Sequence, residues 1–274
     1  MIPLGRAIPG CLVVVMLAAV PAQSQGIAWT DRGYVTIVGG AQVTTATSLG
    51  SAHPVEFIEP ARVDTTYMTT PAPTLGAAGG VRVWRSLAVG GGLSYFGHGH
   101  PATVQAQVPH PFLFGQPRAV SGDTTALSHN ETRIDLQARW VWPATRTRRW
   151  QLDLFGGPSV FLVGQDVVQD VRITQSYPYD SATFAGVSTI HQSRARPGFH
   201  AGAEVSRLVA KRVALGVSLS AAHASVGLTT ADGSTLTVSA GGLQVGAVVR
   251  FVIPRKAATP SRPPARRKPG RLSD

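Results

Sequence analysis

Apolar and polar residues alternate along several stretches of the chain. Between positions 132 and 142 the even residues are mostly apolar and include Ile134 and Leu136, whereas the odd residues include Arg133 and Asp135. Successive side chains of a β-strand point to opposite faces of the sheet. The pattern therefore predicts a strand with one apolar face and one charged face.

Seven other segments have the same period of two. With the first, the predicted strands are 34–45, 74–84, 87–95, 132–142, 150–162, 199–208, 213–220 and 243–251. Since the chain contains no long apolar run after its first residues, one face of these strands is expected to meet hydrocarbon and the other polar groups. The predicted fold class is all-β: an eight-stranded antiparallel transmembrane up-and-down β-barrel.

The connections between the predicted strands alternate in length. Short links are expected around residue 85 and at 143–149 and 210–212, and longer ones at 48–72, 98–129, 165–196 and 227–237. Short periplasmic turns, long extracellular loops and two periplasmic termini fit this arrangement. Four tryptophans lie beside the short turns and predict an aromatic girdle at the membrane interface, namely Trp84, Trp140, Trp142 and Trp150.

The ends of the chain predict export and an unfolded tail. Residues 1–22 resemble a signal peptide, with Arg6 before an apolar run at 11–20, so the mature chain is expected to begin near Gln23 without a cysteine, because Cys11 is the only one. We divide the rest into an N-terminal segment at 23–32, the barrel at 33–253 and a basic, proline-rich periplasmic tail at 254–274.

The formal net charge of +11 is concentrated in this tail, where seven of the 25 basic residues lie. Nucleic acid is not expected as a partner in the periplasm. The tail is instead expected to contact anionic cell-wall groups or lipid headgroups, or to serve as a solvated linker with no partner.

The last predicted strand carries the most specific motif. Gln244, Gly246, Val249 and Phe251 form a polar residue, a glycine and two spaced apolar residues. With this motif, residues 33–253 resemble the small eight-stranded OmpA-like outer-membrane barrels of Gram-negative bacteria. The resemblance implies that these four residues are the signal that the barrel assembly machinery reads, that outer-membrane lipids surround the protein, and that it acts as a monomer.

Charged side chains share the polar face of the predicted strands. They are Arg82, Arg133, Asp135, Arg139, Asp153, Glu204 and Arg250. An eight-stranded barrel is just wide enough for side chains to fill it, so the first hypothesis is a network of ion pairs that plugs the interior. The alternative is a small gated channel in which the same charges select ions or small solutes.

Two groups of residues suggest further chemistry. His98, His100 and His110 are candidate metal ligands if they converge, but the simpler interpretation is polar histidines on a solvated loop, with no metal or cofactor. His223 and Ser225 resemble the His-x-Ser pair of outer-membrane lipid A deacylases, in which serine is the nucleophile and histidine the base. Such a pair also needs an orienting carboxylate, and downstream only Asp232 is available.

The function expected from the sequence is therefore a non-enzymatic outer-membrane barrel with a structural or surface-interaction role, exerted through its extracellular loops. A small channel and a lipid A-modifying enzyme are the two alternatives.

Overall fold

The computed structural model describes residues 31–44, 46–143, 149–230, 233 and 235–254. The predicted signal peptide, most of the segment at 23–32 and nearly all of the basic tail lie outside these residues. The described residues form strands and turns. They include no helix long and apolar enough to span a bilayer.

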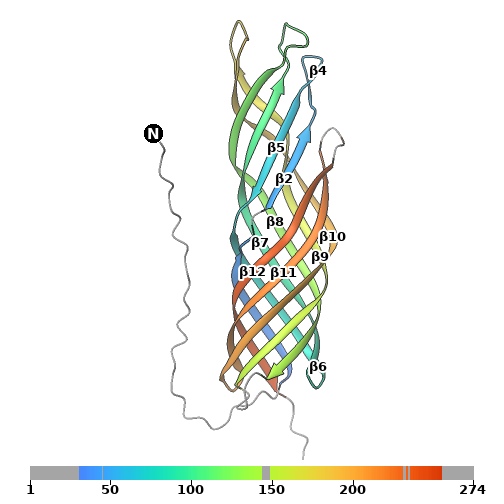
Figure 1. Cartoon of the computed structure of the whole chain (residues 1–274), viewed down its shortest axis with the longest axis vertical. Helices are drawn as coiled ribbons and strands as arrows, with labels where there is room; N and C mark the ends of the chain where they lie inside the picture. Colours follow the sequence, from blue (N-terminus) through green and yellow to red (C-terminus); the bar gives the residue numbers. More distant parts are fainter. Residues whose placement is uncertain (1–30, 45, 144–148, 231–232, 234, 255–274) are drawn as a thin grey trace, which may run out of the picture.

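Eight strands of the described chain form a closed ring (Figure 1). They are β1 (Asp31–Gln42), β6 (Ala72–Trp84), β7 (Leu87–Val108), β8 (Arg118–Pro143), β9 (Trp150–Gln175), β10 (Ala182–Ala210), β11 (Val213–Thr229) and β12 (Thr235–Pro254). Each pairs antiparallel with the next, and β12 pairs with β1 to close the ring. The predicted all-β, antiparallel up-and-down barrel is confirmed.

The strands are much longer than the sequence pattern predicts. β2 (Ala46–Ala52) continues β1, and β5 (Arg62–Thr69) precedes β6 and pairs with both β2 and β7. The short hairpin β3 (Val55–Glu56) and β4 (Glu59–Pro60) joins β2 to β5. The prediction of four long loops is therefore wrong, because most of their residues extend the barrel upward. Among the described residues, the connections at the upper end are the β3–β4 turn at 57–58 and the segments 109–117 and 176–181, and residues 231, 232 and 234 between β11 and β12 lie outside the described part.

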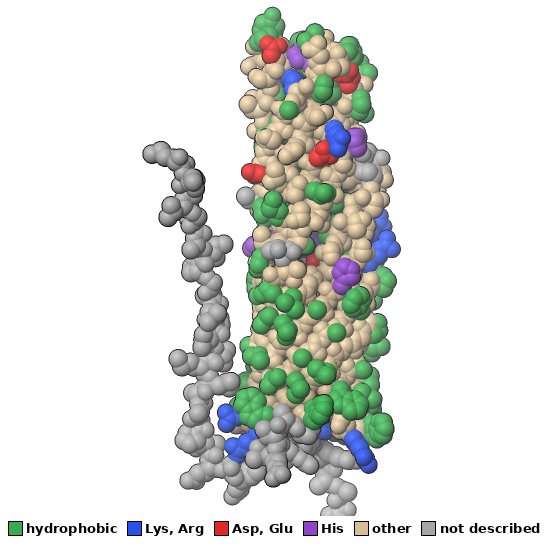
Figure 2. All heavy atoms as spheres, in the orientation of Figure 1, with side chains coloured by type: hydrophobic (Ala, Val, Ile, Leu, Met, Phe, Trp, Pro, Cys, Tyr) green, Lys and Arg blue, Asp and Glu red, His purple; other side chains and the backbone are tan. Residues whose placement is uncertain are grey.

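The reason for this error is that the two faces of the strands exchange character halfway up. On lower β7, Leu93 and Tyr95 point outward and are exposed, while Ser94 points inward. On upper β7 the inward residue Val104 is fully buried and the outward residue Gln105 is exposed. The lower half is thus apolar outside and polar inside, and the upper half is the reverse. Figure 2 shows the outer faces of the two halves.

The hydrogen-bonded ladder changes at the same level. The β8–β9 ladder ends at His129 and Gln165, the β10–β11 ladder at Phe199 and His223, and the β1–β12 ladder at Gln42 and Gln244. Above these pairs, the ladders of the described residues form three separate sheets: β2–β5–β7–β8, β9–β10 and β11–β12.

Individual hydrogen bonds bridge the three seams between these sheets. Ser128 N donates to Asp166 Oδ2 at 2.9 Å, Thr229 N donates to Gln192 Oε1 at 3.0 Å, and Val43 N donates to Leu243 O at 2.8 Å. Water can satisfy the other backbone groups along a seam, whereas hydrocarbon cannot. The ring of strands is fully hydrogen-bonded only in the lower half, where the outer face is apolar. A segment embedded in lipid requires this combination.

Glycines thin the lower wall where β6 and β7 pair. Gly80 lies opposite Gly90, and a Cβ on Gly80 would lie 2.8 Å from the hydroxyl of Tyr34. A Cβ on Gly90 would meet the carbonyl oxygen of Gly79 and lie 2.7 Å from the Cα of Gly80. The inward glycines therefore leave room for the Tyr34 ring and for close contact between the two strands.

We expect Gly90→Ala to lower the free energy of unfolding by about 1–3 kcal/mol, since overpacking forces the backbone to move. Gly91→Ala is the matched control because it points outward, where the only close atom is the carbonyl oxygen of Asp135 at 3.2 Å. Urea unfolding of both variants in detergent measures the difference. Equal stability of the two variants would contradict the steric explanation.

Candidate functional site

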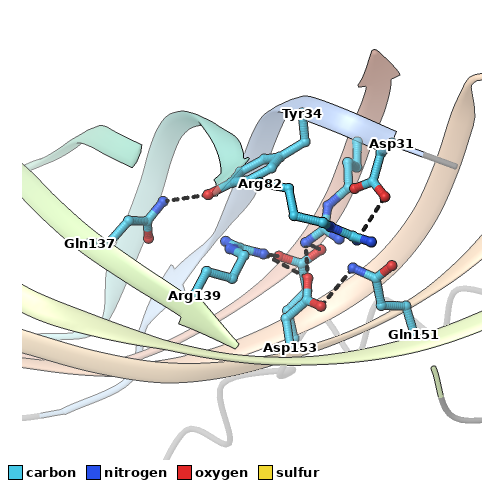
Figure 3. A network of polar contacts seen from close by, with 9 residues as sticks. Asp31, Tyr34, Arg82, Gln137, Arg139, Gln151 and Asp153 are labelled. Carbon is cyan, nitrogen blue, oxygen red and sulfur yellow. Dashed lines mark hydrogen bonds and ion pairs between the residues drawn. The ribbon is translucent and has the colours of Figure 1, made fainter. Parts of the chain in front are cut away.

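The centre of the lower interior is a cluster of two arginines and two carboxylates (Figure 3). Arg139 Nη1 lies 2.9 Å from Asp153 Oδ2 and 2.8 Å from Glu204 Oε2. Arg250 Nη2 lies 2.6 Å from Glu204 Oε1 and also contacts Asp153 Oδ2. Each cation thus contacts both anions, and the cluster is formally neutral.

Strand register brings these residues together from four strands. Asp153 on β9 is the direct cross-strand partner of Glu204 on β10, while Arg139 and Arg250 extend from β8 and β12. All four side chains are at most 3% exposed. A buried ion pair requires good geometry and further hydrogen bonds to offset the loss of hydration.

Neighbouring polar and aromatic groups supply these further contacts. Gln151 donates to Asp153 Oδ1 at 2.6 Å, and Gln137 donates to the hydroxyl of Tyr34 at 3.3 Å. The Tyr34 ring centroid lies 4.8 Å from the Arg139 guanidinium carbon and 5.3 Å from that of Arg250. The ring therefore packs against both cations, which favours their burial.

The other charges predicted for the interior form smaller pairs above and below the cluster. Arg82 Nη2 lies 2.7 Å from Asp31 Oδ1, and Arg133 Nε lies 3.0 Å from the carboxylate of Asp135. All seven predicted residues thus point inward. Sequence reasoning missed Asp31, Tyr34 and Gln137, although Tyr34 and Gln137 have the inward parity of their strands and were identifiable from it.

A cavity of about 70 Å³ lies in the interior at the level of these charges. Arg133, Asp135, Arg139 and Glu204 line its charged side. Small residues line much of the rest, including Gly76, Ala78, Gly92, Ser94, Ser218 and Ser220. A space of this size, with charged side chains along one side, has room for a few water molecules.

Above the cavity, apolar side chains fill the upper barrel. This upper core includes Val104, Val163, Val226 and Leu228, all with 0% exposure. Tyr67 on β5 reaches across to β9, where its hydroxyl accepts a hydrogen bond from Val168 N at 2.9 Å. The core therefore joins opposite walls of the upper half.

The histidines proposed as metal ligands do not converge. The rings of His98 and His100 lie 5.8 Å apart, but Nδ1 of His110 accepts hydrogen bonds from Phe112 N and Leu113 N beyond the end of β7. Within the described residues no group of three or more histidine, cysteine or acidic side chains is arranged to hold a metal. The expectation of solvated histidines is wrong for His100, His110 and neighbouring His129, which are buried, whereas His98 is exposed.

His129 belongs instead to a polar layer between the cavity and the upper core. Its Nε2 lies 2.8 Å from Glu131 Oε1, and its Nδ1 lies 3.1 Å from Gln165 Oε1. The other oxygen of Glu131 accepts from Gly241 N at 2.7 Å. Gly241 has a φ of 87° and lies just beyond the end of the β1–β12 ladder, so the contact with Glu131 ties this glycine to β8 at the level where the closed ladder ends.

A serine, a histidine and an aspartate also meet inside the barrel, but not as a catalytic triad. Ser159 Oγ lies 2.8 Å and Asp135 Oδ1 lies 3.4 Å from the same atom, Nδ1 of His200. In a triad the base contacts the nucleophile through one ring nitrogen and the carboxylate through the other. This group is therefore a structural one.

His223 and Ser225 lie on the outer wall of β11, where both are exposed. His223 Nδ1 lies 3.4 Å from Ser239 Oγ on β12, and Ser225 is the cross-strand partner of Ser239. Asp232, the carboxylate that the sequence offers for a deacylase-like mechanism, lies outside the described residues. Among the described residues, the side-chain contact of His223 is the one with Ser239.

The two sets of residues predicted to meet the membrane and the assembly machinery lie in the lower half. Trp84, Trp140 and Trp142 are exposed at the lower end, and Trp150 packs under Arg207, whose guanidinium carbon lies 5.6 Å from the indole ring. Val249 and Phe251 point outward from β12. Gln244 points inward and donates to Gln42 Oε1 at 3.3 Å, and Gly246 has the same inward parity.

Apolar side chains are also exposed at the distal tips, above the largely polar outer wall of the upper half, where they form separate groups in Figure 2. We define this tip cluster as the exposed apolar residues Val55, Phe57, Ile58, Phe112, Leu113, Phe114 and Tyr177. They lie at the β3–β4 hairpin, the β7–β8 connection and the β9–β10 connection. Nearby, burial and the adjacent carboxylate of Asp170 raise the pKa of the Glu56 carboxyl.

Solved structures similar to this chain are outer-membrane β-barrels. OprG from Pseudomonas aeruginosa has 10% identity and a TM-score of 0.42 over 82% of this chain and 99% of its own. The outer membrane protease OmpT from Escherichia coli has 9% identity and a TM-score of 0.49 over 82% and 97%. The outer membrane protein AlkL has 13% identity and a TM-score of 0.37 over 88% and 98%. No protein-family model and no curated protein sequence matches the chain. The similarity therefore concerns the fold alone.

Proposed function

We propose that this protein is an outer-membrane β-barrel with a structural or surface-interaction role, in which the lower half spans the membrane and the upper half projects outward. The closed ladder coincides with the apolar outer face, as a lipid-embedded segment requires. On lower β7 this region runs from Leu87 to Phe96, which is close to the 9–11 residues that a tilted strand needs to cross a bilayer.

The main support for a structural or surface-interaction role is that side chains fill the barrel interior at two levels. The cluster of Arg139, Arg250, Asp153 and Glu204 occupies the lower half, and the apolar upper core occupies the upper half. We infer that the barrel transports no solute and that its distal surface performs the interaction. Both termini are then periplasmic, since the tips face the exterior.

Conductance in planar bilayers tests this role against the channel alternative. We expect the wild-type protein to produce no channel currents, because neither level leaves a continuous aqueous path. The double variant Arg139→Ala and Glu204→Ala is expected to remain silent as well, since the apolar core above it is unchanged. Conductance in the wild type would instead favour the channel.

Location is tested separately by fractionation of the expressed protein and by its gel mobility before and after boiling. We expect it in the outer-membrane fraction with a heat-dependent shift in mobility. A monomeric protein that remains in buffer without detergent would contradict the membrane assignment.

A further inference from the structure

The tip cluster contains the two most exposed large apolar side chains of the described residues, Ile58 at 88% and Tyr177 at 83%. Val55 and Phe114 are each 73% exposed. Several exposed apolar side chains grouped at one end of a protein mark an interaction site more often than single exposed residues do.

The β3–β4 turn holds two of these residues in an unfavourable backbone conformation. Phe57 and Ile58 have φ values of 49° and 73°, and they connect the cross-strand pair Glu56 and Glu59. A two-residue turn with both φ angles positive favours Asn and Gly, and a β-branched residue there is costly. The apolar side chains therefore oppose local folding preference, and we attribute their presence to a contact outside the chain.

Contacts between the hairpins hold the three tips in one arrangement. Gly115 N donates to Glu59 Oε1 at 2.9 Å, and the rings of Phe112 and Tyr179 lie 5.5 Å apart. Buried Arg118 donates to the carbonyl oxygen of Tyr179 at 2.9 Å and to that of Pro109 at 2.8 Å. A surface fixed in advance loses less conformational entropy on binding.

Several backbone donors at the tips are already satisfied or absent. The N–H groups of Phe112 and Leu113 both donate to His110 Nδ1 at 3.1 Å, and Gly115 N donates to Glu59. Six prolines lie in or beside the tips and have no N–H: Pro54, Pro60, Pro109, Pro111, Pro117 and Pro178. Both features lower the number of donors that lose water when the tips enter an apolar medium.

The charge of the tips restricts the partner. Residues 53–61, 109–117 and 176–181 contain Glu56, Glu59 and Asp180 but no lysine or arginine. The two arginines directly after these ranges are both partnered: exposed Arg62 pairs with Asp64, and buried Arg118 donates to backbone carbonyl oxygens. Anionic lipid surfaces and nucleic acids attract basic segments and repel acidic ones. The three turns differ in length and sequence. A lipid bilayer can accommodate all three because, unlike a protein partner, it needs no complementary pocket for each.

We propose that the tip cluster inserts into the interfacial region of a facing, net-neutral lipid bilayer. This inference rests on the proposed function, since it requires the tips to project outward from the outer membrane. Phe114, Ile58 and the residues around them enter the region between headgroups and acyl chains, while Glu59 and Asp180 remain at the headgroup level.

The test holds the lower half of the protein in a nanodisc and measures flotation with added vesicles. We expect the wild type to float with phosphatidylcholine vesicles and to bind phosphatidylglycerol vesicles more weakly. The double variant Ile58→Asn and Phe114→Ser is expected to lose binding to phosphatidylcholine by tenfold or more, since two exposed apolar side chains no longer enter the bilayer. Asn favours the backbone conformation of residue 58, so this variant is expected to fold at least as well as the wild type.

Leu49→Ser is the matched control, because Leu49 is 75% exposed on the side wall of β2, away from the tips. It is expected to bind as the wild type does. Absence of flotation, equal binding of the double variant, equal or stronger binding to phosphatidylglycerol, or equal loss in Leu49→Ser would each overturn the inference. A heat-dependent mobility shift and protease access to the tips on intact cells test the proposed function independently, so it can stand if this inference fails.

Discussion

Replacing Arg139 by methionine is expected to lower the free energy of unfolding by about 3–5 kcal/mol, because removal of one partner leaves an uncompensated buried charge. Arg139 contacts Asp153 and Glu204 at 2.9 and 2.8 Å, and its side chain is only 3% exposed. After the substitution, two carboxylates face the single cation Arg250. Urea unfolding in detergent micelles measures the loss.

Restoring the charge balance of the cluster is expected to recover part of the lost stability. The double variant Arg139→Met and Glu204→Gln leaves Asp153 paired with Arg250, so the cluster is neutral again. We expect the double variant to lose clearly less stability than the sum of the two single variants. Such non-additivity is the sign of residues that act as one network.

Arg62→Met is the control for loss of an ion pair as such. Arg62 Nε lies 2.8 Å from Asp64, but the two side chains are 61% and 45% exposed. An exposed pair contributes little, so a loss below about 1 kcal/mol is expected. If Arg139→Met costs no more than Arg62→Met, the cluster does not stabilise the barrel.

The part of the fold predicted best from the sequence is the lower half. Alternation assigns a direction to each side chain of a strand, so Arg133, Asp135 and Arg139 were identifiable as a row that points the same way. Their partners were not identifiable, because the contact of Arg139 with Glu204 joins strands 65 residues apart in the chain. Alternation along one strand shows which side chains point inward, but it does not show which residues of other strands lie beside them.

The upper half was missed because alternation by itself does not say which face is inside. Residues 102–108 read Ala-Thr-Val-Gln-Ala-Gln-Val, a regular period of two in which the apolar side chains are small and point inward. A membrane strand is expected to be apolar outside, so this stretch, flanked by histidines and prolines, favours a loop by composition. The tip cluster was hidden for a different reason, since Glu59 and Gly115 meet only in the folded chain.

A charge on the outer wall is expected to distinguish the two halves directly. Leu136→Arg places a guanidinium at an outward position of lower β8, where the native side chain is 60% exposed and its neighbours Ile134 and Trp140 are also apolar and exposed. If this face meets hydrocarbon, the substitution should lower stability in phosphatidylcholine vesicles by about 2–4 kcal/mol, the cost of an arginine near the bilayer midplane. Unfolding by urea after reconstitution measures this cost.

Gln105→Arg provides the matched control in the upper half. Gln105 also points outward and is exposed, but it lies above the closed ladder, where outward residues such as Thr103 and Gln107 are polar. An arginine at this position remains in water, so stability is expected to change by no more than about 0.5 kcal/mol.

An arginine on the inner face of the upper half is expected to have the opposite effect. Val104→Arg buries a charge in the upper core, at a position with 0% exposure, and should prevent folding. If Leu136→Arg and Gln105→Arg have the same effect, the exchange of faces does not mark the membrane boundary, and the lower half does not lie in lipid.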